Sequence, residues 1–431
     1  MHQGRSLVYR PTTTEEAAGA LADAAARGLS VAHRGGGNSY GDLALNEGGA
    51  LLETRALRGI VAFDAERGVV RARAGTTIEE LWAETLPRGW WPTVVPGTQK
   101  VTLGGAVAVN IHGKNQAAVG TIGEHLEAVT LLTPRGDVRT LAGASLMGVI
   151  GGLGLSGTIL DVTLRLRRVH SGLLEVATET AGSLPETLDA LAEGAVAWEH
   201  AVGWIDCFAS GGRAGRGVLH FARDLPEDHA RAGAAMTVRE QTPPERVLAV
   251  MPRRHLGLAL RAVLNDPGLR AINVGRYAVG RLRRGRRTLE PHAGFHFLLD
   301  FIPGWKRAYP DGLMQYQLFV PRDAASYAFA EALRLQAATG VRSYLGVLKR
   351  HRADPFPNSY LMDGFSLALD FPVRDRNVER LVRLFRSYDA LLGEVGGGIY
   401  AAKDATSHGP LPDARDPLFS SNLVRRWERG R

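Results

Sequence analysis

A glycine-rich loop near the N-terminus has the composition of an anion-binding site. Leu29 to His33 alternates as a short strand does and runs directly into Arg34-Gly35-Gly36-Gly37-Asn38-Ser39-Tyr40-Gly41-Asp42. Because glycine has no Cβ, the backbone N–H groups of the triplet can converge on an anion. A glycine triplet after a strand is also typical of a plain tight turn. If the loop binds a ligand, a diphosphate suits it best.

Further glycine-bearing segments follow in the same third of the chain. They are Pro96-Gly97-Thr98, Leu103-Gly104-Gly105, Ile111-His112-Gly113-Lys114-Asn115 and the run over residues 151–157. Several such loops in one domain indicate a long, folded ligand. The two common nucleotide-binding folds are disfavoured, because no helical pattern follows Tyr40 directly and no Lys-Thr pair closes the first loop.

Short strands and helices must position these loops. Two apolar runs over residues 60–74 predict a hairpin. Thr76 and Glu79 then predict a capping box for a helix that reaches Leu86. Further on, the pattern changes to alternating strands and longer helices, so we expect a domain boundary near residue 170.

The composition is that of a globular protein. Its 431 residues, 45% hydrophobic and 22% charged, exceed one ordinary domain, so we expect two. No run approaches the roughly 20 apolar residues of a membrane-spanning helix. Cys207 is the only cysteine, which excludes an internal disulfide and a cysteine-rich metal site. From these features we expect a cytoplasmic protein without a metal site.

The ordered glycine segments resemble those of one known family. Arg34 to Asp42, residues 96–98, 101–105 and 111–115 together are similar to the decaprenylphosphoryl-β-D-ribose oxidase family of the vanillyl-alcohol-oxidase superfamily. The resemblance continues through Gly203-Trp204-Ile205-Asp206, Trp305-Lys306-Arg307-Ala308-Tyr309, Gln315-Tyr316-Gln317, Val347-Leu348-Lys349, Leu369-Asp370-Phe371-Pro372 and Tyr400-Ala401-Ala402-Lys403-Asp404. It therefore covers nearly the whole chain in order.

The resemblance implies an α+β fold. A PCMH-type FAD-binding domain would be joined to an α+β substrate domain, an antiparallel sheet covered by helices. We expect the FAD-binding domain over residues 1–170 and the substrate domain over 171–395. The C-terminal segment, 396–431, would return to the FAD domain near Tyr400.

The resemblance also implies an FAD-dependent oxidoreductase that acts on CH–OH donors. A hydride would leave the carbon that bears a ribose 2-hydroxyl for the flavin, while a base takes the hydroxyl proton and a 2-keto sugar remains. Related enzymes pass that ketone to a separate NAD(P)H-dependent ketoreductase, which gives net epimerisation. The substrate would be a small or lipid-linked molecule that contains a phosphorylated or nucleoside sugar.

Three side chains are the catalytic candidates. His112 is the first candidate base, because the unperturbed pKa of imidazole lies near neutrality, although a lone histidine is usually structural. Lys349 and Lys403 match family lysines whose charge would stabilise a reduced flavin and a developing alkoxide.

Binding residues follow from the same resemblance. Gln315 and Gln317 lie two apart on a predicted strand, so both would face one side and hydrogen-bond sugar hydroxyls. Tyr40, Lys114 and Trp204 complete the substrate pocket that the family implies. The residues expected at FAD are Arg34, Gly35, Gly36, Gly37, Asn38, Ser39, Tyr40, Pro96, Gly97, Thr98, Thr102, Leu103, Gly104, Gly105, Asn110, Ile111, His112, Gly113, Asn115, Gly157, Ile159 and Tyr400.

Two positions depart from the family. Asn38 stands where many members of the superfamily carry a histidine bonded covalently to the flavin, and an amide cannot form that bond, so we expect noncovalent FAD. Ala368 stands where the best-known members of the family carry a cysteine. Because of this second departure, the resemblance does not determine which group is attached to the sugar in the substrate.

Other functions remain as alternatives. One is an alditol, lactone or oligosaccharide oxidase, and one of another class is a flavin-binding or basic carrier protein without turnover. The net charge of +8 and the arginine run over residues 281–287 allow a phosphate, a peripheral membrane contact or a disordered solubilising loop. We expect no nucleic-acid partner.

Overall fold

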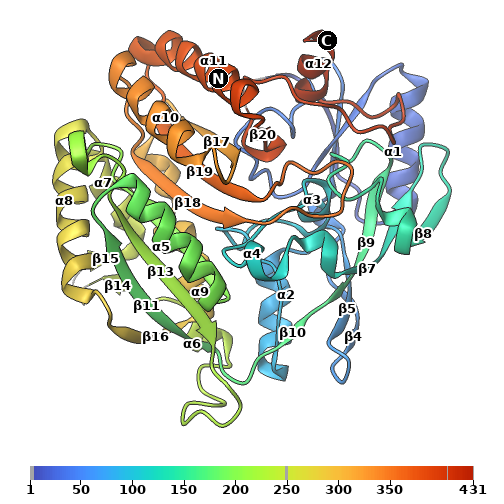
Figure 1. Cartoon of the computed structure of the whole chain (residues 1–431). Coiled ribbons are helices and arrows are strands. Elements are labelled where there is room, and N and C mark those ends of the chain that lie inside the picture. The colour runs from blue at the N-terminus through green and yellow to red at the C-terminus, as the bar shows by residue number, and fades with distance from the viewer. Residues whose placement is uncertain (1–3, 248–250, 405, 431) are drawn as a thin grey trace.

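The computed structural model describes residues 4–247, 251–404 and 406–430 (Figure 1). Residues 1–3, which the sequence assigns to the FAD-binding domain, lie outside the described residues. Helices and mainly antiparallel sheets alternate along the chain, which confirms the expected α+β fold class.

The described N-terminal part contains two larger sheets and a two-stranded sheet of β6 (Trp90–Trp91) and β10 (Arg167–Arg168). One larger sheet is parallel with strand order β1-β3-β2, and the other is antiparallel with order β4-β5-β9-β7-β8. The hairpin predicted over residues 60–74 is confirmed as the pair β4 and β5. The strands are β1 (Leu7–Tyr9), β2 (Val31–Arg34), β3 (Ala50–Glu53), β4 (Ile60–Asp64), β5 (Val69–Arg73), β7 (Leu126–Leu132), β8 (Val138–Ala142) and β9 (Thr158–Arg165).

Helices α1 (Thr14–Ala26), α2 (Ile78–Thr85) and α3 (Leu103–Ala108) pack against these sheets. The predicted cap of α2 was wrong by one residue, because Thr77 and Glu80 form the capping box. The hydroxyl of Thr76 instead accepts a hydrogen bond from the backbone N–H of Gly59 at 2.9 Å. The side chain of Thr76 therefore ties the turn after the hairpin to the residue just before β4.

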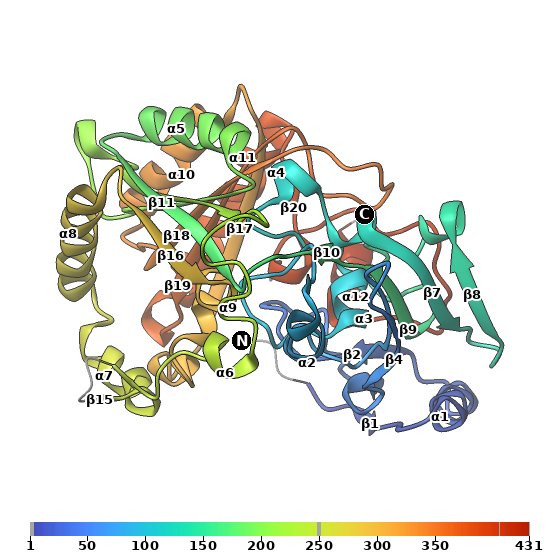
Figure 2. The same ribbon diagram turned by 90° about the horizontal axis from the view of Figure 1, so that it is seen from below.

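The second half is built on an eight-stranded sheet of order β16-β11-β13-β12-β18-β19-β17-β20, antiparallel throughout. Helices α5, α10 and α11 cover one face, and the N-terminal elements, drawn in blue and cyan, lie on the other side (Figure 2). The bounds are β11 (Leu173–Ala181), β12 (His200–Ile205), β13 (Gly217–Asp224), β16 (Arg287–Pro291), β17 (Leu313–Pro321), β18 (Leu345–His351), β19 (Gly364–Pro372), β20 (Gly398–Ile399), α5 (Leu184–Ala197), α10 (Ala325–Thr339) and α11 (Val378–Val395).

Alternation along the central strands separates the core from a cavity. Tyr316 and Leu318 of β17 point into the hydrophobic core beneath the helices. Gln315 and Gln317, one residue out of phase, line the cavity on the opposite face. The same alternation in β18 and β19 places Leu348, Leu367 and Leu369 in the core and their neighbours at the cavity.

Helix α8 (Asp266–Arg283) covers the β11–β13 edge of this sheet on the cavity side (Figure 1). Gly280 allows close approach, because a Cβ there would lie 2.8 Å from Val218. The arginine run is ordered: it spans the end of α8, a turn and the start of β16. Arg284 pairs with Glu179 at 3.1 Å and Arg287 with Glu175 at 2.8 Å, so the disordered-loop alternative was wrong.

The C-terminal segment contacts both halves. Strand β20 pairs with β17 in the large sheet, whereas α12 (Asn422–Arg429) packs into the core around α1. The backbone N–H of Tyr40 donates to the carbonyl of Ala402 at 2.8 Å, which joins this segment to the glycine loop. No helix in the described ranges is both long and apolar enough to span a membrane.

Candidate active site

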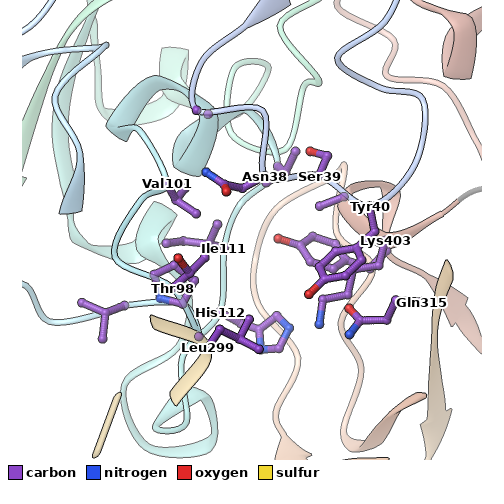
Figure 3. A pocket seen from close by; sticks show the side chains of 18 of the residues that line it. Asn38, Ser39, Tyr40, Thr98, Val101, Ile111, His112, Leu299, Gln315 and Lys403 are labelled. Atoms are coloured by element: carbon purple, nitrogen blue, oxygen red, sulfur yellow. The ribbon is translucent and has the colours of Figure 1, made fainter. Parts of the chain in front are cut away.

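A cavity of about 600 Å³ lies between the N-terminal glycine loops and the face of the eight-stranded sheet opposite helices α5, α10 and α11. Figure 3 shows Tyr40, Gln315 and Lys403 on one side and Thr98, Val101 and Ile111 on the other, with His112 between them. All the predicted catalytic and substrate-binding residues line it: His112, Lys349, Lys403, Tyr40, Lys114, Trp204, Gln315 and Gln317. Of the predicted FAD residues, it is lined by Gly35, Gly36, Gly37, Asn38, Ser39, Tyr40, Pro96, Gly97, Thr98, Thr102, Gly104, Gly105, Ile111, His112, Gly157, Ile159 and Tyr400.

The remaining predicted FAD residues, namely Arg34, Leu103, Asn110, Gly113 and Asn115, are not among the cavity-lining residues. Leu103 is fully buried in the core around α3. Asn110 donates to Asp354 at 2.9 Å and accepts from the N–H of Gly123 at 3.1 Å. The amide of Asn115 donates to the carbonyl of Thr93 at 2.9 Å. In this structure the side chains of Asn110 and Asn115 shape the loops rather than the cavity wall.

The glycine loop makes a cradle in which side chains would not fit. A Cβ on Gly36 would lie 2.5 Å from the carbonyl oxygen of Lys100, and one on Gly104 would lie 2.9 Å from the Cβ of Ala74. The Asn38 amide donates to the same Lys100 carbonyl at 2.9 Å and holds the loop against its neighbour. Close-packed glycine backbone in the cavity wall fits a diphosphate-bearing cofactor such as FAD.

On the sheet face, two glutamine carbonyls have no partner among the described residues. Gln315 and Gln317 are only 6% and 4% exposed, and the Oε1 atom of each is buried without a hydrogen bond. Their amide N–H groups are used, since Gln315 donates to Asp370 and Gln317 donates to Ser366 at 2.9 Å. Because an unsatisfied buried acceptor is costly, these oxygens are suited to accept hydrogen bonds from ligand hydroxyls.

His112 lies between two of the other predicted residues. Its Nδ1 is 3.5 Å from Lys349 Nζ, and its Nε2 is 3.5 Å from the amide nitrogen of Gln317. Burial is the main cause that lowers the pKa of His112 well below its ordinary value, and the charge of Lys349 adds to the effect. At neutral pH the imidazole is therefore neutral, and it is a weaker base than an exposed histidine.

Lys349 and Lys403 are both partly buried at the cavity. Burial, followed by the neighbouring Lys403, lowers the pKa of Lys349 well below its ordinary value. Burial lowers the pKa of Lys403 to about 8, and the attraction of Asp370 limits that fall. The Asp370 carboxyl has its own pKa raised to about 6 by burial. A lysine with a pKa of about 8 is partly neutral at neutral pH, so Lys403 can accept a proton there.

Sequence reasoning missed several titratable residues at the cavity. Asp370 was quoted only within the family motif, although a single carboxylate in the otherwise uncharged strand β19 was a signal that could have found it. Arg276, His220 and His296 also line the cavity. No sequence signal marked them, because their place at the cavity depends on how β13, α8 and the segment after β16 pack in the folded chain.

Comparisons with known proteins show what the whole chain is similar to. Residues 6–142 match the family model of an FAD binding domain. The chain is 28% identical to decaprenylphosphoryl-beta-D-ribose oxidase of Mycolicibacterium smegmatis over 427 residues, which are 93% of this chain and 90% of that protein. It is 30% identical over 355 residues to an uncharacterized protein in the mprA 5' region of Streptomyces coelicolor, 80% of this chain and 93% of the relative. An L-gulono-1,4-lactone dehydrogenase of Mycobacterium tuberculosis is 27% identical over 161 residues, 37% of each chain.

Proposed function

The chain belongs to the FAD-linked oxidoreductases related to decaprenylphosphoryl-β-D-ribose oxidase, and from this premise we propose that it oxidises the 2-hydroxyl of a ribofuranose-type sugar to a ketone. FAD is its cofactor, and sugar oxidation is the chemistry of the relatives by their names. The proposed substrate is a phosphorylated, lipid-linked or nucleoside sugar. Because Asn38 has no atom that could tether the flavin, we also propose that the FAD is noncovalent.

The observation that carries this proposal is the pair of unsatisfied glutamine carbonyls beside a cluster of basic side chains. Gln315 and Gln317 present acceptors for two sugar hydroxyls, and Lys403, Lys349 and His112 line the same part of the cavity. A purely apolar ligand would leave those carbonyls unsatisfied. A polyhydroxylated ring satisfies them.

Oxidation of a secondary alcohol needs a hydride acceptor and a proton acceptor. Bound FAD supplies the two-electron acceptor for the hydride of the C–H bond. The hydroxyl proton passes to the neutral amine of Lys403, whose pKa of about 8 leaves a useful fraction unprotonated at neutral pH. Gln315 and Gln317 orient the ring, and Lys349 and His112 line the wall beside it. The pKa values favour Lys403 over His112 as the base.

The test is anaerobic bleaching of bound FAD by a panel of sugars. The panel contains polyprenyl-phosphoryl ribose, nucleosides, free pentoses and alditols, and the product is identified by mass and by the position of the ketone. We expect reduction by a ribofuranose-containing compound with the ketone at the 2-position. Reduction by xylitol or sorbitol alone would instead assign an alditol oxidase, and reduction by a lactone alone would favour the function named for the lactone dehydrogenase relative.

We also propose a partner enzyme for this function. A separate NAD(P)H-dependent ketoreductase would reduce the ketone and complete an epimerisation. The division near residue 170 is supported by the sheets, since all strands of the five-stranded sheet precede residue 170 and β11 begins at Leu173. The division at residue 395 stays a proposal, because β20 pairs with β17 of the large sheet while α12 packs around α1. The cytoplasmic location stays a prediction.

A further inference from the structure

A second cavity lies outside the candidate active site. It has a volume of about 340 Å³ and lies where the first residues of α8, the end of α10 and the first residues of α11 come together. Cavities of this size hold small molecules. None of its lining residues also lines the cavity that contains the glycine loops and the two glutamines. The proposed sugar oxidation therefore gives this second cavity no role.

Four arginines line the second cavity. Arg342 lies shortly before β18, Arg374 and Arg376 lie between β19 and α11, and Arg380 lies in the first turn of α11. The first, second and fourth of these are half-buried, and Arg376 is exposed. Because a guanidinium keeps its charge at neutral pH, the cavity wall carries four positive charges. Two separate stretches of the chain supply them, so the cluster forms only in the folded protein.

These arginines have no acidic partners. Among the residues that the structure describes, none of the four forms an ion pair with a carboxylate. Three of them donate to backbone carbonyls instead: Arg342 to Cys207 at 3.0 Å, Arg374 to Leu264 at 3.3 Å, and Arg380 to the residue four before it at 3.4 Å. Neutral acceptors leave the charges uncompensated, and like charges gathered around one cavity repel each other unless an anion joins them.

The charge balance of the lining residues indicates the size of that anion. Asp266 is the one acidic residue among the described residues that line the cavity, and its carboxylate accepts a hydrogen bond from the hydroxyl of Tyr344 at 3.0 Å. Four guanidinium groups and one carboxylate leave a net charge of +3. A single phosphate carries about two negative charges at neutral pH. A diphosphate group therefore matches the cavity better than one phosphate does.

The N-terminus of α11 adds to the positive potential. Asn377 is its N-cap residue and lines the cavity, but its side chain does not cap the helix. The Asn377 amide instead donates to the carbonyl of Pro372 at 3.0 Å and accepts from the backbone N–H of Arg374 at 2.8 Å. The positive end of an 18-residue helix dipole thus lies at the arginine cluster without a side-chain cap.

We propose that the cavity lined by Arg342, Arg374, Arg376 and Arg380 is a second binding site, which binds a small molecule through a diphosphate group. Guanidinium groups suit this ligand, because each can donate two parallel hydrogen bonds to phosphate oxygens. The proposal does not depend on the proposed sugar oxidation, since the two cavities share no lining residue. Inorganic diphosphate and a nucleoside diphosphate offer the same group, so both serve as probes.

The experiment measures binding to the FAD-loaded protein after unbound flavin has been removed. Inorganic diphosphate, adenosine diphosphate, inorganic phosphate and sulfate are titrated by calorimetry at one ionic strength. We expect one diphosphate per chain, bound at least about 10-fold more tightly than phosphate or sulfate, and a rise in the thermal unfolding midpoint when it binds. Tighter binding of adenosine diphosphate than of inorganic diphosphate would identify a nucleotide, and equal binding would identify the diphosphate group alone.

Variants locate the bound diphosphate. Arg376→Gln and Arg380→Gln should each weaken its binding about 10- to 100-fold, the usual effect of losing a charge-assisted hydrogen bond. Arg380→Lys should weaken it less than Arg380→Gln. Arg281→Gln, at an exposed arginine outside both cavities, is the matched control. Arg276→Gln changes an arginine that lines the active-site cavity, and it should leave diphosphate binding unchanged.

Three results would overturn the proposed site. The first is wild-type protein that binds diphosphate no more tightly than sulfate at the same ionic strength. The second is an unchanged Kd in the Arg376→Gln, Arg380→Gln double variant, provided that its circular dichroism and FAD content match those of the wild type. The third is binding that is lost in Arg276→Gln and kept in Arg380→Gln, because it would place the diphosphate in the active-site cavity.

Discussion

The ammonium of Lys403 shows how a buried position changes what a lysine can do. In water a lysine is almost fully protonated at neutral pH and cannot accept a proton. Here burial lowers the pKa to about 8, and Asp370 keeps it from falling further. Asp370, whose own pKa burial raises to about 6, therefore holds the amine of Lys403 near the useful range.

We predict that flavin reduction at saturating sugar becomes faster as the pH rises toward 8 and then levels off. The reason is that only the neutral amine of Lys403 accepts the hydroxyl proton, so the rate should fall about tenfold for each pH unit below the pKa. Stopped-flow reduction between pH 6 and 9 measures the profile. A rate that falls with rising pH would mean that the protonated amine is the active form.

Substitutions at the two candidate bases provide the second residue-level prediction. Lys403→Ala and His112→Ala should retain the fold and slow flavin reduction by about 100- to 10,000-fold. Only Lys403→Ala should abolish the pH dependence. Lys306→Ala, at an exposed lysine outside the cavity, serves as the control. Near-normal single-turnover reduction in both variants would remove these residues from the mechanism.

At the level of elements, the glycine loop and the loop before α3 form one unit. The carbonyl of Lys100 accepts from Asn38 and leaves no room for a side chain on Gly36. This contact joins two segments that are 62 residues apart in the chain, and both border the cavity close to the expected diphosphate. The close contact between the glycine loop and the loop before α3 is therefore needed to form the cradle for the diphosphate.

We predict that Gly36→Ala lowers the FAD content of the purified protein at least about tenfold while the helices and sheets remain, because the added Cβ would push against a backbone carbonyl. Gly19→Ala, in α1 with open space around it, is the matched control and should keep full FAD. Flavin is measured in the supernatant after acid precipitation. Yellow flavin left in the pellet of the wild type would contradict noncovalent binding.

For the whole molecule, a buried group of histidines lies where the substrate sheet meets the N-terminal part. His200, His292 and His296 have ring nitrogens without hydrogen-bond partners among the described residues, and Trp91 packs 4.8 Å from His292 between ring centroids. Burial is the main cause that lowers the pKa of all three below the ordinary value, to about 3 for His292. The folded protein therefore binds fewer protons at this place than the unfolded chain does.

We predict that the free energy of unfolding falls as the pH drops from about 7 to 5. Each of these histidines has a lower pKa in the folded protein than in the unfolded chain. Its contribution to the free energy of unfolding is therefore fully present above the unfolded pKa of about 6.5 and is lost as the pH falls below that value. The loss is at most about 1.4 kcal/mol per histidine and pH unit. The raised pKa of Asp370 makes the free energy of unfolding increase on acidification, but this is one group against three histidines. Urea unfolding of the FAD-loaded protein measures the slope, and His292→Leu should reduce it. Constant or rising stability on acidification would refute this account.

The glycine segments, the alternation of Gln315 and Gln317 and the family motifs were readable from the sequence, because each depends on residue type and short spacing. These local signals were sufficient for the fold class, the cofactor and the enzyme class. The hairpin over residues 60–74 was equally readable, whereas the cap of α2 was misplaced by one residue because two adjacent threonines carry the same signal.

Only the tertiary structure decided which of those residues share a cavity and what their environment does to them. The pKa of Lys403 depends on burial and on Asp370 in a distant strand, and Arg276 reaches the cavity only because α8 folds over the β11–β13 edge. The sequence could not rank His112 against Lys403 as the base, since an unperturbed pKa is a property of residue type and a shifted one is a property of the surroundings. Desolvation and contacts between segments far apart in the chain have no local pattern, so they appear only once the chain is folded.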